Sequence, residues 1–248
     1  MKRAKKKIID NKQPLVIPQS WQQFPNGLHL RNCVELKIKN FLEGFTGEKL
    51  LALGALAHEI NLSHCKINQR IRLDWNLEPF SDLVSSPDAL ALESESIDLI
   101  ILPLLLNYSE NHHQILREAH RVLVAGGKIC IVAINPWSLW AIRALIGRVR
   151  NKPLWKSQLH LQYRICDWLE LLQFEVLNTA ISGPIIPWKL SMNKMPEFIK
   201  KAFFFEKGIG AMQVIVAEKK VIPFTLIKNS WKNLPVNTSV EVNIREAV

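Results

Sequence analysis

The sequence predicts an α/β domain of three layers, a sandwich in which helices cover both faces of a mostly parallel β-sheet. Strand-like and helix-like stretches alternate along most of the chain, as they do in βαβ units. Residues 111–124 carry apolar side chains at helical spacing, which indicates a helix packed on a sheet. Residues 128–134 are apolar on both faces, as central parallel strands are.

The first half of the chain starts with an amphipathic helix and continues with short strands. The helix is expected over 28–43, where only Lys37 interrupts the apolar face. A buried strand at 50–54 follows it, and this strand ends at Gly54. The elements expected next are a short helix at 55–63 and strands at 67–73, 82–84 and 97–102.

The second half repeats the alternation with clearer signals. The helix at 111–124 leads through a turn at Gly126 and Gly127 to the strand at 128–134. Asn135 is suited to cap a following helix, with Pro136 at its first position. The elements expected after it are helices at 164–174 and 195–205 and strands at 175–182 and 211–220.

Composition indicates a globular protein. The chain has 248 residues, of which 48% are hydrophobic, enough for a substantial core. No apolar run reaches the ~18 residues of a membrane-spanning helix, and the N-terminus lacks the apolar region of a secretion signal. We therefore expect a cytoplasmic protein with a basic tail over 1–20, the α/β domain over 21–222 and a polar tail over 223–248. The four cysteines lie far apart in the sequence, so we expect buried thiols.

Basic residues gather in two parts of the chain. The net charge is +10, and residues 111–165 carry nine basic side chains and one acidic side chain. A short basic tail is usually solvated, but these residues also suit a peripheral contact with a membrane through the tail and residues 137–155. We rank nucleic acid lower as a partner, because no module that reads RNA or DNA surrounds the basic residues.

Residues 116–136 resemble a segment of class I S-adenosylmethionine-dependent methyltransferases of the type-11, UbiE-like kind. In that family the pattern E-x-x-R-V-L-x-x-G-G precedes the fifth strand. The residues at its defined positions here are Glu118, Arg121, Val122, Leu123, Gly126 and Gly127. Over nearly its whole length the chain resembles the YafS-like branch of proteobacterial proteins. The resemblance implies a seven-stranded sheet with one antiparallel strand at 211–220, and S-adenosyl-L-methionine as the cofactor.

The resemblance also locates a cofactor turn, and the turn is depleted. Typical relatives read V-L-D-L-G-C-G-T-G, whereas residues 50–58 read LLALGALAH. Only Gly54 keeps its glycine, and Leu56 and His58 narrow the approach to the backbone. We therefore expect weak or lost cofactor binding. The residues that the resemblance places against the cofactor are Leu53, Gly54, Ala55, Asp74, Ser86, Asp88 and Leu104.

Several of these residues also have a structural interpretation. Gly54 ends a strand at a point where the chain must turn in any case. Asp74, the candidate for the ribose hydroxyls, is equally well explained as a solvated loop acid. Ser86 and Asp88, the candidates for adenine, belong to a Ser-Pro-Asp sequence that makes a good turn.

Residues 135–155 combine tryptophans with basic side chains after the fifth strand, where ligands of open α/β sheets bind. One interpretation is a covering helix with buried tryptophans and a solvated basic edge. The other is a platform for a small or lipid-like acceptor, with Asn135, Trp137 and Trp140 as substrate-binding residues. The spacing of residues indicates no catalytic motif and no metal site. Two functions follow: a methyltransferase, or an inactive binding or scaffold protein with the methyltransferase fold.

Overall fold

The computed structural model describes residues 17–75, 81–150, 153–155, 157–184, 186–187 and 209–220. These residues form a seven-stranded sheet with the strand order β3-β2-β1-β4-β5-β7-β6. The strands are β1 (Thr46–Leu53), β2 (Lys66–Asp74), β3 (Leu83–Val84), β4 (Ile97–Pro103), β5 (Leu123–Ile134), β6 (Phe174–Ser182) and β7 (Met212–Lys219).

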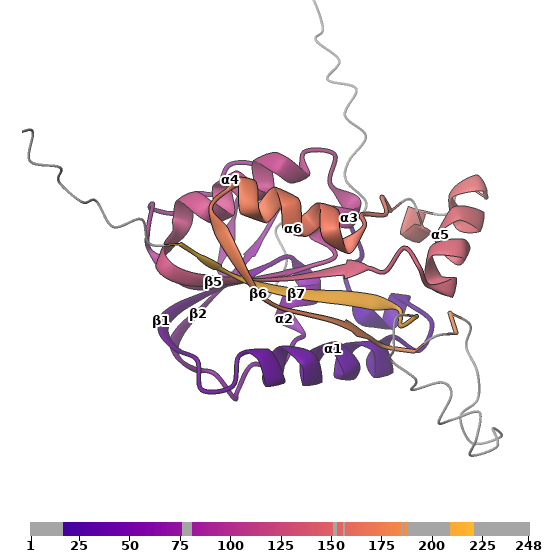
Figure 1. The fold of residues 1–248 in the computed structure, drawn as a ribbon, viewed down its shortest axis with the longest axis horizontal. Helices are drawn as coiled ribbons and strands as arrows, with labels where there is room; N and C mark the ends of the chain where they lie inside the picture. Colours follow the sequence, from indigo (N-terminus) through magenta and orange to yellow (C-terminus); the bar gives the residue numbers. More distant parts are fainter. Residues whose placement is uncertain are drawn as a thin grey trace, which may run out of the picture.

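The sheet is parallel except for β7, which runs antiparallel to both β5 and β6. Figure 1 shows α1 (Gly27–Phe41) along one face of the sheet, and α4 (His112–Val122) and α6 (Gln162–Leu171) along the other. These observations confirm the three-layer α/β fold and the seven-stranded sheet with one antiparallel strand.

The topology places a ligand crevice beside β1. The chain runs outward from β1 to β2 and β3, then returns to β4 on the other side of β1. The strand order therefore reverses between β1 and β4. In open α/β sheets, ligands bind at such a reversal, outside the carboxyl ends of the strands.

The helices bury the faces that their sequences predict. In α4, an apolar stripe at helical spacing faces the core, while Arg117 is exposed. The buried residues of this helix are Ile115, Leu116, Ala119 and Val122. In α1, the residues buried at the same spacing are Leu30, Val34 and Ile38. Tertiary packing of these stripes, rather than helix propensity, fixes both helices on the sheet.

Several predicted boundaries differ from the structure, among them the start of β1, which lies at Thr46 and not at Leu50. Gly126 and Gly127 lie inside β5, where the pairing with β4 is irregular, and the φ of +78° at Gly126 accommodates that irregularity. The helix expected at 55–63 is only α2 (Ala55–His58), because Arg70 donates to three carbonyl groups at and beyond its end. Asn135 begins a turn, and α5 (Leu139–Val149) starts four residues later.

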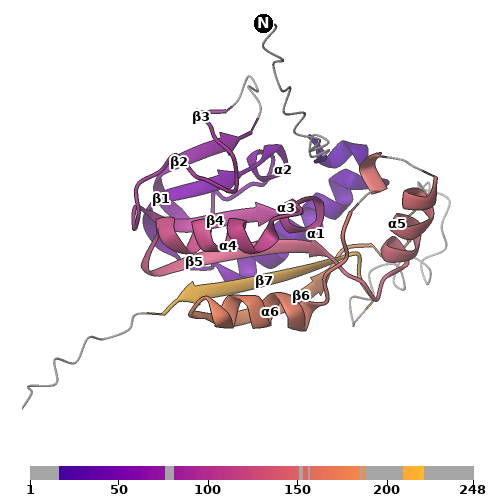
Figure 2. The same cartoon turned by 90° about the horizontal axis from the view of Figure 1, so that it is seen from above.

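An aromatic cluster holds α5 at the end of the sheet. Its ring centroids lie 6.1 to 6.3 Å apart, and its members are Trp21, Phe24, Trp140 and Trp155. Trp21 belongs to a 3-10 turn (Trp21–Gln23), and Trp155 ends another (Pro153–Trp155). Figure 2 shows that α5 stands beyond the carboxyl end of β5. Another one-turn helix, α3 (Leu105–Tyr108), follows β4.

Several predictions fall outside the described residues. These are the helix at 195–205, residues 1–16 of the basic tail and the whole polar tail over 223–248, so the domain boundaries stay predictions. No disulfide joins the four cysteines, all of which are described. Cys65 and Cys130 are buried as expected, whereas Cys33 and Cys166 are only half-buried. In the described part of the chain, no helix combines the length and the apolar character needed to cross a membrane.

Candidate functional site

The turn after β1 lies at the point where the strand order reverses. Gly54 forms it with a φ of +85°, and the Gly54 amide donates to the Leu73 carbonyl of β2 at 2.8 Å. With its ψ of 159°, this backbone conformation is one that only glycine adopts readily. The turn therefore needs glycine for its own geometry, in addition to any close approach of a ligand.

Asp74 ends β2 level with this turn, because Leu53 and Leu73 pair in the β1–β2 register. The Asp74 side chain is fully buried, at 0% exposed, which excludes the interpretation as a solvated loop acid. Its Oδ1 accepts a hydrogen bond from the Trp75 amide at 2.8 Å, whereas Oδ2 is buried without a partner. An unsatisfied buried group costs about 1–3 kcal/mol, so this oxygen is an acceptor ready for a ligand hydroxyl.

Two further polar atoms close to the turn are buried without a hydrogen-bond partner. They are Nε2 of His58, at the end of α2, and Nε1 of Trp75. Burial lowers the pKa of His58, and the negative charge of nearby Asp74 opposes that shift. Unsatisfied buried polar atoms are uncommon in native proteins. Their grouping around one turn marks a place where a polar ligand would satisfy several atoms together.

The Trp75 ring crowds this turn. A Cβ built on Gly54 would lie 2.9 Å from Cη2 of Trp75, so the ring packs on the glycine backbone itself. Leu56, which the sequence suggested as an obstruction, is 1% exposed and belongs to the hydrophobic core. Sequence analysis missed Trp75, for which the only available signal was its place directly after Asp74.

The other predicted cofactor residues have mixed surroundings. Leu53 is buried and Ala55 is half-buried, on either side of Gly54. Ser86 is exposed in a turn, while Oδ2 of Asp88 accepts a hydrogen bond from Nδ2 of Asn111 at 2.9 Å. Asp88 therefore stabilises the start of α4 through Asn111.

Leu104, the last predicted cofactor residue, follows β4 in a left-handed conformation. Its φ is +57° and its side chain is fully buried. A left-handed leucine is strained by about 1–2 kcal/mol, and such strain often collects at functional sites. The strained residue lies at the end of β4, where the topology places the crevice.

The predicted substrate residues divide into one exposed side chain and two buried ones. Trp137 is 76% exposed, whereas Asn135 and Trp140 are buried. Both ends of the Asn135 amide are engaged, since Nδ2 donates to the Gly210 carbonyl and Oδ1 accepts from the Trp137 amide. Trp140 donates to the Pro184 carbonyl from inside the core. The platform interpretation is therefore wrong for Trp140, and Asn135 holds the turn that presents Trp137.

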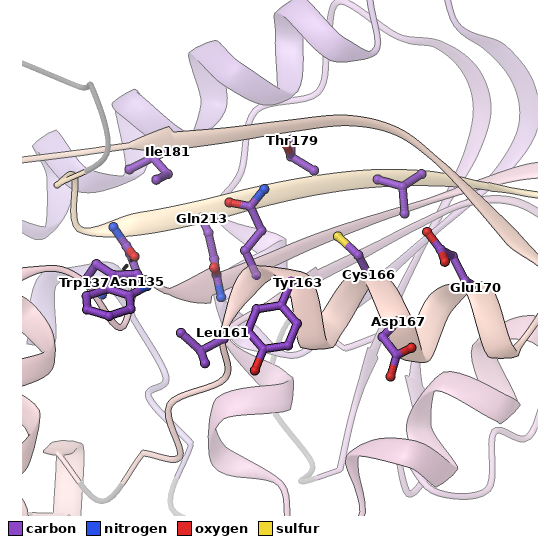
Figure 3. A pocket seen from close by; sticks show the side chains of 12 residues that line it. Asn135, Trp137, Leu161, Tyr163, Cys166, Asp167, Glu170, Thr179, Ile181 and Gln213 are labelled. Atoms are coloured by element: carbon purple, nitrogen blue, oxygen red, sulfur yellow. Dashed lines mark hydrogen bonds between the residues drawn. The ribbon is translucent and has the colours of Figure 1, made fainter.

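Asn135 and Trp137 nevertheless mark one end of a groove of about 640 Å³ between α6 and the strands β6 and β7. Figure 3 shows Tyr163, Cys166 and Glu170 lining it from α6, with Thr179 and Ile181 opposite. The groove joins apolar side chains to carboxylate, amide and hydroxyl groups. Such a mixed lining suits a ligand with both apolar and polar parts.

A cluster of histidines lies at the start of α4. The His112 ring stacks on Trp168 with a centroid distance of 4.4 Å, and it lies 4.9 Å from the His160 ring. Nδ1 of His112 is buried without a partner. Burial lowers the pKa of His112 to about 4, and the nearby charges of His160, His113 and Arg164 act in the same direction. In the described residues, no group of histidine, cysteine and acidic side chains is arranged to hold a metal ion.

The lowered pKa of His112 predicts that the folded protein becomes less stable in acid. Between pH 6.5 and about 4, the unfolded chain binds a proton at His112 and the folded chain does not, so stability falls as the pH falls through this range. For a partly solvated side chain we expect about 1 kcal/mol. Melting temperatures measured from pH 7 to pH 4 should fall less steeply in His112→Gln than in the wild type. Equal slopes in the two proteins would contradict the assignment, and Arg117→Gln, at an exposed position on the same helix, serves as the control.

Comparisons with known proteins agree with this geometry. A methyltransferase domain matches residues 44–131, the part of the chain that holds Gly54, Asp74 and Leu104. The chain is 32% identical over 238 residues to the uncharacterized protein YafS of Escherichia coli K12, covering 95% of this chain and 92% of that protein.

Solved structures show the same fold at low sequence identity. An S-adenosylmethionine-dependent methyltransferase from Thermotoga maritima is 15% identical with a TM-score of 0.52, covering 78% of this chain and 91% of the other. One from Archaeoglobus fulgidus is 14% identical with a TM-score of 0.52, covering 76% and 94%. Both of these proteins are S-adenosylmethionine-dependent methyltransferases, and their likeness to this chain shows its fold. With its match to YafS over nearly the whole length of both proteins, the chain belongs to the YafS-like family, and its fold is that of the class I methyltransferases.

Proposed function

We propose that the protein transfers a methyl group from S-adenosylmethionine to a small or lipid-like acceptor, and that its cofactor site binds more weakly than that of typical relatives. One observation carries the proposal. Asp74 is buried at the carboxyl end of β2 with an unpartnered carboxylate oxygen, beside the glycine turn of β1. A buried carboxylate oxygen without a partner stabilises no contact of the ligand-free protein, which supports a role toward a ligand.

The residues around the turn fit the adenosyl group. Asp74 would accept hydrogen bonds from the two ribose hydroxyls through Oδ2, since Oδ1 already holds the Trp75 amide. Gly54 would let the ligand approach the backbone, because it has no Cβ. When bound, the cofactor supplies a methyl group activated by its sulfonium charge. The protein then has to orient the acceptor in line with that methyl group and keep water away, which can supply much of the rate without a catalytic side chain.

The acceptor is proposed to bind in the groove between α6 and β6. Its near end at Asn135 follows β5, which lies two strands from β1, or about 10 Å at ~4.8 Å per strand. Trp137 and Tyr163 would contact apolar parts of the acceptor, and Thr179 would contact polar parts. The mixed lining and the volume of about 640 Å³ support an acceptor with an apolar chain or ring and a polar end.

The position of the Trp75 ring supports the proposal that the cofactor binds more weakly than in typical relatives. Its ring packs on Gly54, so it has to move before a ligand can reach the glycine backbone. The apparent affinity falls by the fraction of molecules in which the ring has moved. We therefore expect a dissociation constant in the micromolar range or weaker.

Titration of the purified full-length chain tests the proposal. Isothermal calorimetry with S-adenosylmethionine and S-adenosylhomocysteine should give saturable heat in the micromolar range. A hundredfold excess over the dissociation constant stabilises the protein by about 2.7 kcal/mol, which should raise the melting temperature by roughly 5–10 °C. Adenosine triphosphate, which shares the adenosine group but has no sulfonium or amino acid group, serves as the comparison ligand.

The packing of Trp75 on the turn also favours a second candidate, an inactive scaffold protein with the methyltransferase fold. In that case the ring is a permanent part of the core, and Asp74 is a relic without a ligand. Absence of both heat and thermal shift at millimolar cofactor would support the scaffold and reject the enzyme.

A further inference from the structure

The helix α5 carries apolar side chains on two opposite faces. Its inner face packs into the core through Trp140, Ala141 and Ala144, which are at most 3% exposed. A second set of apolar residues, here called the outer stripe, faces solvent at the spacing i, i+3, i+4 and i+7. The outer stripe consists of Ile142, Leu145, Ile146 and Val149, which are 53%, 54%, 51% and 88% exposed.

The outer stripe is unlike the other exposed apolar residues of the described chain. On α1 and α6 such residues stand singly, as Leu36 and Leu171 do, and single exposed residues are normal. On α5 four of them form a contiguous stripe, and exposed Trp137 precedes the helix. A contiguous exposed apolar patch usually marks an interaction surface.

The charges beside the outer stripe indicate an anionic partner. Residues 135–155 contain four basic side chains and no acidic side chain. Arg143 and Arg150 line a cavity of about 350 Å³ together with Leu139, Ile142 and Ile146. The Arg143 guanidinium lies over the Trp155 ring, 5.0 Å from its centroid, which fixes the positive charge at the edge of the stripe. An apolar stripe bordered by arginine is the pattern of a helix that lies in a bilayer interface.

The position of α5 agrees with such a contact. Figure 2 shows α5 as the element that stands beyond the carboxyl end of the sheet, away from its strands. Trp137, two residues before the helix, lines the groove of Figure 3. A flat surface placed against α5 would therefore lie beside one end of that groove. Tryptophan is favoured at the level of lipid headgroups, because its ring is amphipathic.

We propose that the outer stripe of α5 docks on the surface of an anionic lipid bilayer, with its apolar side chains in the headgroup region and its arginines on lipid phosphates. The surface does not depend on the cofactor site, so the two proposals can fail separately. If both hold, the bilayer delivers a lipid-like acceptor to the groove end at Trp137.

Sedimentation of the full-length chain with vesicles tests this proposal. We expect binding to phosphatidylcholine vesicles that contain phosphatidylglycerol, weaker binding to phosphatidylcholine alone, and a decrease with added salt. The double variant Leu145→Glu with Val149→Glu should bind the anionic vesicles at least tenfold more weakly. The control is Leu36→Glu with Leu171→Glu, which changes two exposed leucines by the same charge on other helices and should bind like the wild type.

Because the basic tail could itself hold an anionic vesicle, the comparison between the two double variants decides the result. Equal binding by both would overturn the proposal. Light scattering tests whether a second copy of the chain covers the outer stripe instead. In that case the wild type is a dimer and Leu145→Glu with Val149→Glu is a monomer, while the control variant stays a dimer. If the stripe variant alone has a lower melting temperature and still binds vesicles, another part of the same chain covers the outer stripe. Either outcome would also overturn the proposal.

Discussion

Replacing Asp74 by asparagine is expected to weaken S-adenosylmethionine binding by roughly 10- to 100-fold while leaving the ligand-free protein folded. The asparagine Oδ1 can keep the hydrogen bond from the Trp75 amide that Oδ1 of Asp74 accepts now. The lost group is the unpartnered carboxylate oxygen, which would accept charge-assisted hydrogen bonds from the ribose. Such bonds contribute about 1.5–3 kcal/mol, and ~1.4 kcal/mol corresponds to a tenfold change in affinity.

The ligand-free stability of the Asp74→Asn variant provides the second half of this test. Since Oδ2 has no partner in the protein, its removal should leave the melting temperature without cofactor unchanged or slightly higher. Asp82→Asn removes the same charge from an exposed residue that pairs with Arg72, so it should bind cofactor like the wild type. A large loss of melting temperature in Asp74→Asn with unchanged affinity would assign Asp74 to the fold instead of the site.

Gly54 offers a less direct test of the same site. A side chain there meets both the strain of the +85° φ and the Trp75 ring at 2.9 Å. A bulky substitution would therefore disturb the turn together with any binding, and the two effects could not be separated. Asp74 is the better position because its unpartnered oxygen can be removed without a change of shape.

Sequence periodicity predicted the fold well, because burial in this protein follows simple patterns. The stripe of α4 and the apolar run of β5 each have one arrangement that hides them from water. The predictions that failed concern residues whose conformation depends on neighbours that are distant in the sequence. Gly126 accommodates irregular pairing with β4 inside a strand, and nothing in the local sequence distinguishes that from a loop.

The site was less predictable than the fold for the same reason. Sequence analysis found Gly54 and Asp74 but could not decide whether Asp74 is buried, since that depends on the packing of β1, β2 and β3. It missed Trp75, whose ring reaches across from the end of β2 to the turn of β1. Trp140 was misplaced because α5 is apolar on both faces, and periodicity cannot tell which face packs on the aromatic cluster.

The residues that carried the family resemblance turn out to connect the end of α4 to the loop before β4. Arg121 donates to both oxygens of Glu118 and to the carbonyls of Leu90 and Leu92. Glu118 in turn accepts the Leu90 amide at 2.9 Å. These bonds fix the loop that follows the β3 turn with Asp88. The spacing of a glutamate and an arginine three residues apart, which the family pattern also has, therefore has a structural role here.

Replacing Arg121 by glutamine should lower the free energy of unfolding by about 2–3 kcal/mol, because it leaves two loop carbonyls without their donor and Glu118 without its partner. The melting temperature should fall by roughly 5–10 °C. Arg117→Gln, at an exposed position on the same helix, is the matched control and should change the melting temperature little.

The hydrogen bond from Arg121 lowers the pKa of Glu118 below 4.5. This carboxylate therefore stabilises the fold above that pH, and the contribution is lost as the pH falls. The difference in stability between the wild type and Arg121→Gln should therefore narrow in acid, and a difference that stays constant from pH 7 to pH 3 would show that the loss comes from the loop carbonyls and not from the ion pair.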